Sequence, residues 1–204
     1  LGRALTTSLR DAGALVVVCG RNENKFNDSF EDKNNIEFAL MDASNFGSTT
    51  AAVEQVVNKY GKMDILVNNA FCCVSSTPDV VSEDSWKYGI DGVLNSVFAC
   101  TNAALPHMKR QQSGNIINIS SIYGFRSPDF KIYKEYEKFF SPLNYGASKA
   151  AIIQMTKYYA TYYAKENIRF NCISPGPFPN EAVQKEEKFI NLLEDKIPAG
   201  RIGQ

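Results

Sequence analysis

Five short runs of nearly continuous apolar residues, separated by longer helical stretches, most constrain what this chain can fold into. We predict strands over residues 15–19, 36–40, 65–67, 114–119 and 168–173. Strands that are apolar along their whole length suit a sheet covered on both faces, and such sheets are parallel. The sequence therefore predicts a parallel sheet with helices on both sides.

The segments between these runs are long enough to be the right-handed crossovers that parallel strands require. We predict helices over residues 2–11, 48–60, 82–111 and 142–166. The βαβ alternation indicates one α/β domain spanning residues 1–204. Residues 124–141 are expected to form a long loop that leads to a helix capped by Ser141 and opened by Pro142.

Both ends of the chain are expected to be cut. A doubly wound parallel sheet begins with a strand and a glycine turn that holds a pyrophosphate, whereas this chain opens in a predicted helix. We therefore expect the first strand to be missing and Gly2 to be the remnant of the glycine turn. The abrupt stop at Gln204 suggests that more structure follows.

Composition excludes several functional classes. Lys and Arg number 22, as do Asp and Glu, so no overall field attracts a nucleic acid. No apolar run approaches membrane-spanning length and the start has no signal-peptide pattern, so a cytoplasmic protein without a membrane partner is expected. The five cysteines show no metal-ligand spacing, and we expect reduced thiols and no metal.

Tyr145 and Lys149 are the sharpest chemical signal. Residues four apart on a helix project from the same face, and an ammonium beside a phenol lowers the phenol pKa towards the range of general acid/base catalysis. Taken alone, a Tyr and a Lys at this spacing are better explained as two surface residues of a helix. The strand over 114–119, however, is followed by Ser120 and Ser121, and ligands sit at the carboxyl ends of parallel strands. Ser121 is expected in that crevice, whereas Ser120 reads as a strand terminator.

These motifs occur in one order along nearly the whole chain. They are Asp42 after a strand, Asn68-Asn69-Ala70, Ile119-Ser120-Ser121, Tyr145 to Lys149, and Ile168 to Asn171 followed by Pro175-Gly176. In this order and spacing the chain resembles the classical short-chain dehydrogenase/reductase family. The resemblance implies a Rossmann-type doubly wound sheet and an oxidoreductase that interconverts an alcohol and a carbonyl with NAD(P).

The resemblance also implies a role for each matching residue. Tyr145 exchanges a proton with the substrate oxygen, Ser121 hydrogen-bonds that oxygen, and Lys149 lowers the Tyr145 pKa and holds the nicotinamide ribose. Cofactor contacts are expected from Gly2, Arg21, Asp42, Asn68, Ala70, Tyr145, Lys149, Pro175, Gly176 and Phe178. The alternatives are a helix cap for Asp42, a turn at Asn68 and Asn69, and a rigid loop after Pro175. His107 is expected to be structural, at a buried helix break.

Several positions depart from the family pattern. Phe71 stands where glycine is usual and is expected to crowd the cofactor, and Val93 stands where the family commonly carries an asparagine. Asn95 is expected to face elsewhere. The segment 126–142 is longer than usual, and a loop beside the catalytic tyrosine forms a wall of the substrate pocket. Its polar members, Asp129, Lys131, Tyr133, Lys134 and Tyr136, predict a polar, sugar-like substrate.

Cofactor choice is predicted from Arg21, which follows the strand where an acidic residue selects NAD. An arginine in its place favours NADP over NAD. The resemblance further implies a homodimer or homotetramer built on the helices over 82–111 and 142–166. The rival hypothesis is a non-catalytic nucleotide-binding or scaffold protein that retains the fold. Phe71, Val93 and the missing ends favour the rival, and retention of Ser121, Tyr145 and Lys149 opposes it.

Overall fold

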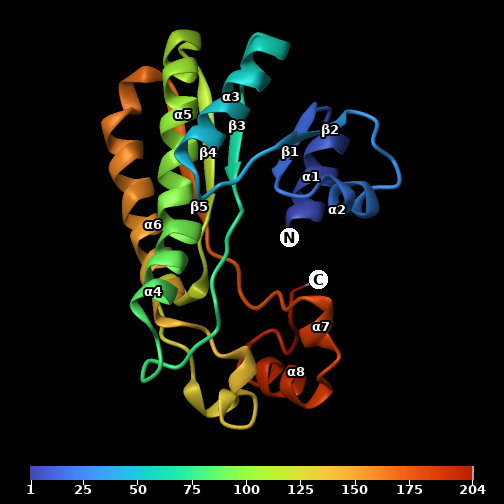
Figure 1. Cartoon of the computed structure of the whole chain (residues 1–204), viewed down its shortest axis with the longest axis vertical. Helices are drawn as coiled ribbons and strands as arrows, with labels where there is room; N and C mark the ends of the chain where they lie inside the picture. The colour runs from blue at the N-terminus through green and yellow to red at the C-terminus, as the bar shows by residue number, and fades with distance from the viewer. Residues whose placement is uncertain (204) are drawn as a thin grey trace.

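The computed structural model describes residues 1–203, in which five strands alternate with eight α-helices (Figure 1). The strands are β1 (Val16–Gly20), β2 (Ile36–Leu40), β3 (Ile65–Asn68), β4 (Gly114–Ile119) and β5 (Ile168–Ile173). The helices are α1 (Gly2–Asp11), α2 (Glu23–Ser29), α3 (Phe46–Tyr60), α4 (Glu83–Ile90), α5 (Ser96–Gln111), α6 (Leu143–Tyr162), α7 (Glu181–Gln184) and α8 (Glu187–Glu194). Within the described chain, no helix has the length and apolar character needed to cross a membrane.

All strand pairs are parallel, as the apolar runs predict, but the pairing falls into two groups. β1 pairs with β2, and β3, β4 and β5 pair in that order. β1 and β3 present facing edges that do not pair, and a cavity of about 1010 Å³, lined by both strands, lies between them. Figure 1 shows the β1–β2 group with α1 and α2 beside the taller β3–β5 group.

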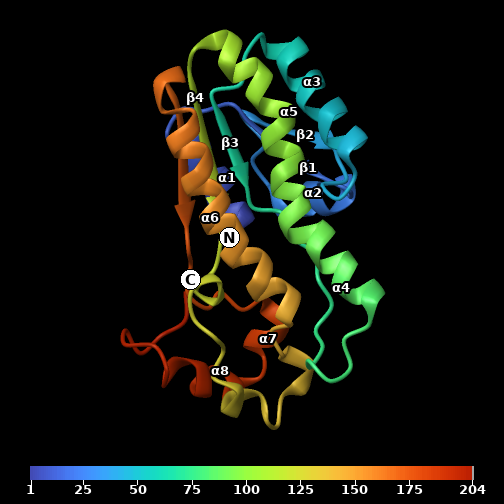
Figure 2. The ribbon, with the colours of Figure 1, turned by 90° about the vertical axis from the view of Figure 1, so that its left-hand side faces the viewer.

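Helices α5 and α6 lie along one face of the β3–β5 group (Figure 2). Ala104, Leu105 and Met108 of α5 are buried against Ile116 and Phe170 of the sheet. Burial of a large apolar side chain such as Leu105 or Met108 stabilises the fold by about 1.5–3 kcal/mol. Tyr159 and Ala160, near the carboxyl end of α6, pack against the same cluster.

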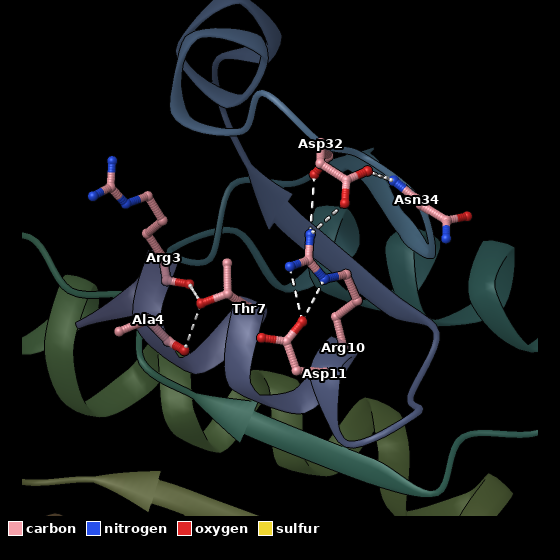
Figure 3. A network of polar contacts seen from close by, with 7 residues as sticks. All are labelled: Arg3, Ala4, Thr7, Arg10, Asp11, Asp32 and Asn34. Atoms are coloured by element: carbon pink, nitrogen blue, oxygen red, sulfur yellow. Dashed lines mark hydrogen bonds and ion pairs between the residues drawn. The ribbon is translucent and has the colours of Figure 1, made fainter.

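Helix α1 is tied to the β1–β2 group by a polar contact network at its carboxyl end (Figure 3). The Arg10 guanidinium lies 2.8 Å from the Asp11 carboxylate and 3.2 Å from that of Asp32, in the turn before β2. Asp32 in turn accepts a hydrogen bond of 2.9 Å from the Asn34 backbone N–H. The helix that borders the cavity is therefore anchored at one end.

The predicted helix over 82–111 is interrupted. Ser82 caps α4 by accepting a hydrogen bond from the Ser85 N–H, but Asp91–Asn95 form a π-helical segment before α5 begins. A side chain at Gly92 would overlap Cys72, whose N–H donates to the Gly92 carbonyl. Segments of this kind mark functional regions of helices. The expected break at His107 is wrong, because α5 continues through Pro106.

The segment expected to be a long loop contains short 3₁₀ turns at Phe130–Tyr133 and Glu137–Phe139. It packs against α8 through a second apolar core that includes Ile132, Tyr133, Phe189 and Leu193. The prediction that Ser141 caps the following helix is wrong. Pro142 is the N-cap and makes no side-chain hydrogen bond, so α6 begins at Leu143 and gains its stability from packing.

Candidate active site

Ser121, Tyr145 and Lys149 come together where β4 ends against the start of α6. Ser121 lies two residues after β4 and is buried, and Tyr145 and Lys149 lie in the first two turns of α6. The Ser121 hydroxyl lies close enough to the Tyr145 phenol to influence the phenol pKa. The Ser121 oxygen accepts a hydrogen bond of 3.1 Å from the Tyr123 N–H, which fixes its position.

Two further hydrogen bonds hold the end of β4 against α6. The Ser120 hydroxyl donates to the Lys149 carbonyl at 2.7 Å, and the Lys149 ammonium donates to the Ile119 carbonyl at 2.6 Å. Gly124 closes over the same spot, because a Cβ there would lie 2.8 Å from the Lys149 carbonyl oxygen. Ser120 and Gly124 therefore shape the site, a role that the sequence motifs do not signal.

The Lys149 ammonium is enclosed by aromatic rings as well. It lies 5.5 Å from the centre of the Tyr145 ring and 5.9 Å from that of Phe71, and the two ring centres are 5.9 Å apart. Lys149 is only 3% exposed, whereas Phe71 is 60% exposed. Phe71 thus covers the lysine from the solvent side.

The pKa values of the pair differ from expectation. Burial raises the pKa of Tyr145, an effect that the neighbouring Ser121 hydroxyl only partly offsets. Burial lowers the pKa of Lys149 to about 8. The expectation that Lys149 lowers the Tyr145 pKa is not met in this structure, because desolvation dominates and the ammonium is directed at the Ile119 carbonyl.

A network of hydrogen bonds between buried polar side chains connects the elements that carry the site. The Asn68 amide donates to Asn118 at 2.8 Å and to Thr101 at 3.2 Å, and the Asn118 amide donates to Thr156 at 2.9 Å. These four side chains come from β3, α5, β4 and α6, and all are buried. Since buried polar groups with partners specify a unique packing, the network sets the relative positions of the strands and helices that carry the site.

Four of the predicted cofactor residues line one cavity. Gly2, Arg21, Asn68 and Ala70 line the cavity between β1 and β3, at the carboxyl ends of both strands. A cavity of about 1010 Å³ is large enough for a cofactor, and its arginine and asparagine residues are suited to phosphate and ribose oxygens. The part of the cavity that lies between the strands is lined by apolar residues, which do not suit phosphate or ribose oxygens. The residues present therefore fit a dinucleotide at the carboxyl end of the cavity.

The side chains of Asp42 and Asn68 form hydrogen bonds with other residues of the protein. The Asp42 carboxylate accepts bonds from the N–H and hydroxyl of Ser44, at 3.0 and 2.7 Å. Bonds from Ser44 and the nearby charge of Arg21 lower the Asp42 pKa. The cap of α3 is Asn45, so the capping alternative for Asp42 does not hold.

The loop after β5 approaches Ser121 from the other side. The Pro175 carbonyl accepts a bond of 3.1 Å from the N–H of Ile122, the residue after Ser121. Phe178 is 41% exposed, and the Pro177 carbonyl accepts a bond from the Gly203 N–H. Pro175, Gly176 and Phe178 thus belong to a loop attached to the catalytic candidates.

Val93, at the position of the missing asparagine, is fully buried in a cluster with Val97 and Ile152, against which Tyr145 packs. It therefore supplies packing and no polar group. The Asn95 amide donates to Asp91 at 2.7 Å, away from the site as expected.

Comparison with known proteins places these features in context. A family model described as short chain dehydrogenase matches residues 1–191. The chain is 30% identical over 210 residues to the 3-oxoacyl-[acyl-carrier-protein] reductase FabG of Thermotoga maritima, covering 100% of this chain and 80% of the relative. A crystal structure of a short chain dehydrogenase from Leptospira borgpetersenii with bound NAD⁺ is 30% identical with a TM-score of 0.86, covering 98% and 75% of the two chains. ElxO with NADP bound is 26% identical with a TM-score of 0.85, covering 99% and 80%.

Proposed function

Because the chain belongs to the short-chain dehydrogenase family and is an NAD(P)-dependent oxidoreductase acting on CH–OH and C=O groups, we propose that Ser121, Tyr145 and Lys149 form its catalytic centre. The observation that carries the proposal is that the Ser121 hydroxyl, which follows β4, lies beside the Tyr145 phenol on α6, with the Lys149 ammonium 5.5 Å from the Tyr145 ring centre. Two hydroxyls that share one buried position at the carboxyl end of a strand can both reach a single substrate oxygen.

In this proposal the cofactor supplies or accepts the hydride, and the protein handles the proton. During carbonyl reduction the Tyr145 phenol donates its proton to the substrate oxygen, which becomes the alcohol, and the phenolate is left behind. The raised pKa of Tyr145 keeps the phenol protonated before the reaction. Ser121 hydrogen-bonds the same oxygen and stabilises the charge that develops there.

The cofactor would be held by residues on both sides of the cavity. We assign the nicotinamide ribose to Lys149, the adenine side to Asp42, and further contacts to Gly2, Asn68, Ala70 and the loop of Pro175, Gly176 and Phe178. Arg21 is exposed directly after β1, which supports a preference for NADP over NAD through a charge-assisted contact with the 2′-phosphate.

Three of the five residues that predict a polar substrate make contacts within the protein. Asp129 forms a salt bridge with Lys196, at 2.9 Å, and the buried Tyr133 shares a hydrogen bond of 2.9 Å with Tyr123. Tyr136 packs in the second apolar core. Asp129, Tyr133 and Tyr136 therefore contribute to the stability of the loop, whereas Lys131 and Lys134 are exposed to solvent.

A largely apolar alcohol or ketone is the better-supported substrate class. Large apolar side chains are exposed in the segments that follow β3, β4 and β5 and at the first residue of α6, namely Val74, Phe125, Phe178 and Leu143. The Thermotoga relative's name describes a 3-oxoacyl compound, which combines a carbonyl with an acyl chain. A panel of ketones and sugars tests this proposal: kcat/KM should rise with apolar length, and turnover of sugars alone would contradict it.

We further propose a homodimer or homotetramer formed by the outer faces of α5 and α6. Phe98, Tyr158 and Tyr162 are exposed there, and the rings of Tyr158 and Tyr162 stack at 6.4 Å. Exposed aromatic groups of this kind favour protein contacts. A cytoplasmic location remains a prediction, supported by five cysteines that are all free.

The rival scaffold hypothesis is tested by hydride transfer itself. Reduced cofactor should be oxidised when a carbonyl substrate is added, and Tyr145→Phe provides the matched control. A protein that binds NADPH but consumes none with any carbonyl of the panel would favour the scaffold.

A further inference from the structure

Phe71 lies between two parts of the site. Its neighbour Ala70 lines the cavity assigned to the dinucleotide, while the Phe71 ring contacts Tyr145 and Lys149. The ring is 60% exposed, although the lysine beneath it is 3% exposed. A large apolar side chain exposed at this point makes contact with the catalytic candidates and shields little else.

The Lys149 ammonium is enclosed on three sides. The Ile119 carbonyl accepts its hydrogen bond at 2.6 Å, and the rings of Tyr145 and Phe71 lie within 6 Å of it. Because an ammonium is attracted to the face of an aromatic ring, and more so when it is desolvated, each ring stabilises this position. Of the two rings, Phe71 is the more exposed, since Tyr145 is only partly exposed.

The backbone next to Phe71 is restrained, whereas the Phe71 side chain is largely exposed to solvent. The N–H of the next residue, Cys72, donates to the Gly92 carbonyl at 3.2 Å, which holds the loop against the π-helical segment. Rotation about the Phe71 side-chain bonds would move the ring into solvent and uncover Lys149. No backbone hydrogen bond has to break for this rotation.

We propose that Phe71 is a positioning residue that holds Lys149 in a closed arrangement, so that the ring must turn away before a dinucleotide can engage the lysine. The inference rests on the proposed function, in which Lys149 binds the nicotinamide ribose. It follows that Phe71 weakens dinucleotide binding and takes no part in proton transfer. The short-chain dehydrogenase pattern, with glycine at this position, lacks such a cover.

Dinucleotide binding measured by calorimetric titration with NADPH tests the proposal. Phe71→Leu removes the aromatic face and should tighten binding about 2- to 5-fold, the range expected for one cation–π contact. Phe71→Gly also removes the bulk and should tighten binding at least as much. Phe71→Tyr keeps the ring and should stay within about 2-fold of wild type. Equal or weaker binding by both the Leu and Gly variants would overturn the proposal.

A second measurement needs no cofactor. Ring currents shift the NMR signal of the Lys149 ε-methylene group, which is assigned by its loss in Lys149→Arg. Phe71→Leu should move this signal downfield and Phe71→Tyr should not, while Phe130→Leu controls for loss of an exposed phenylalanine elsewhere. An unchanged signal in Phe71→Leu would refute the closed arrangement. If no variant binds NADPH while the signal moves, the proposed function fails and the closed arrangement stands.

Discussion

The Ser120 hydroxyl donates a hydrogen bond of 2.7 Å to the backbone carbonyl of Lys149, and this contact is one of two hydrogen bonds that hold the end of β4 against α6. Ser120→Ala should lower the free energy of unfolding by about 0.5–1.5 kcal/mol, the net value of one such bond. Turnover should fall too, because Ser121 and Lys149 are no longer held in register. Urea denaturation measures the first effect, and Ser120→Thr, which keeps the hydroxyl, serves as the control. Unchanged stability in the Ala variant would contradict this reading.

The depressed pKa of Lys149 predicts how stability depends on pH. The group titrates near pH 8 in the folded chain and near its ordinary value of 10.5 when unfolded. Between these values the unfolded state binds more protons, so this residue's contribution to stability rises with pH from about 8 to 10.5 and is constant below that window. Stability rises with pH because burial destabilises the charged form of Lys149, and the lysine loses its charge as the pH rises.

Comparison with Lys149→Met isolates that contribution, since other groups, including Tyr145 with its raised pKa, oppose it at high pH. The stability of the wild type relative to the Lys149→Met variant should increase by about 2 kcal/mol between pH 8 and pH 10. Lys157→Met, exposed on the same helix, should show no such trend. A difference between wild type and Lys149→Met that stays flat across this window would rule the prediction out.

Arg21 is expected to set cofactor preference. Arg21→Ala should lower kcat/KM for NADPH about 10- to 100-fold, the value of one charge-assisted contact with the 2′-phosphate, and leave that for NADH within about 2-fold. Arg169→Ala, an exposed arginine on β5, is the matched control. A wild-type kcat/KM at least as high for NADH as for NADPH would refute the assignment.

The facing edges of β1 and β3 do not pair, so we expect one more parallel strand between them to stabilise the chain. Extending the chain before Leu1 with an apolar strand and a glycine turn should raise the melting temperature and strengthen NADPH binding, because it buries both edges and the apolar cavity wall. A matched extension with proline in the strand cannot pair and should have no effect. Equal melting temperatures and affinities for both extensions would count against the prediction.

Much of the fold was predictable because its strands are continuous apolar runs. β2, β4 and β5 have the predicted bounds, and β1 and β3 differ by a residue at their ends. The short helices α2, α7 and α8 were not predicted, because they depend on contacts with distant segments; Phe26 of α2, for example, packs on Phe38 of β2. The interruption of α4 and α5 likewise arises from a tertiary contact, between Gly92 and Cys72.

The candidate site was predictable in membership and not in geometry. Spacing on a helix and position after a strand brought Ser121, Tyr145 and Lys149 together. The direction of the Lys149 ammonium depends on the Ile119 carbonyl and the Phe71 ring, and no local pattern encodes either contact. The pKa shifts follow from burial, which the spacing of two residues does not reveal.

The central claim is that Tyr145 supplies the proton that accompanies hydride transfer. Its most direct test is the kcat of Tyr145→Phe for carbonyl reduction at saturating NADPH, with NADPH affinity and the unfolding midpoint measured alongside. The ring stays and only the acid is removed, so kcat should fall about 10²- to 10⁴-fold while affinity and stability change little. A Tyr145→Phe protein that turns over at a rate near that of the wild type would contradict the account.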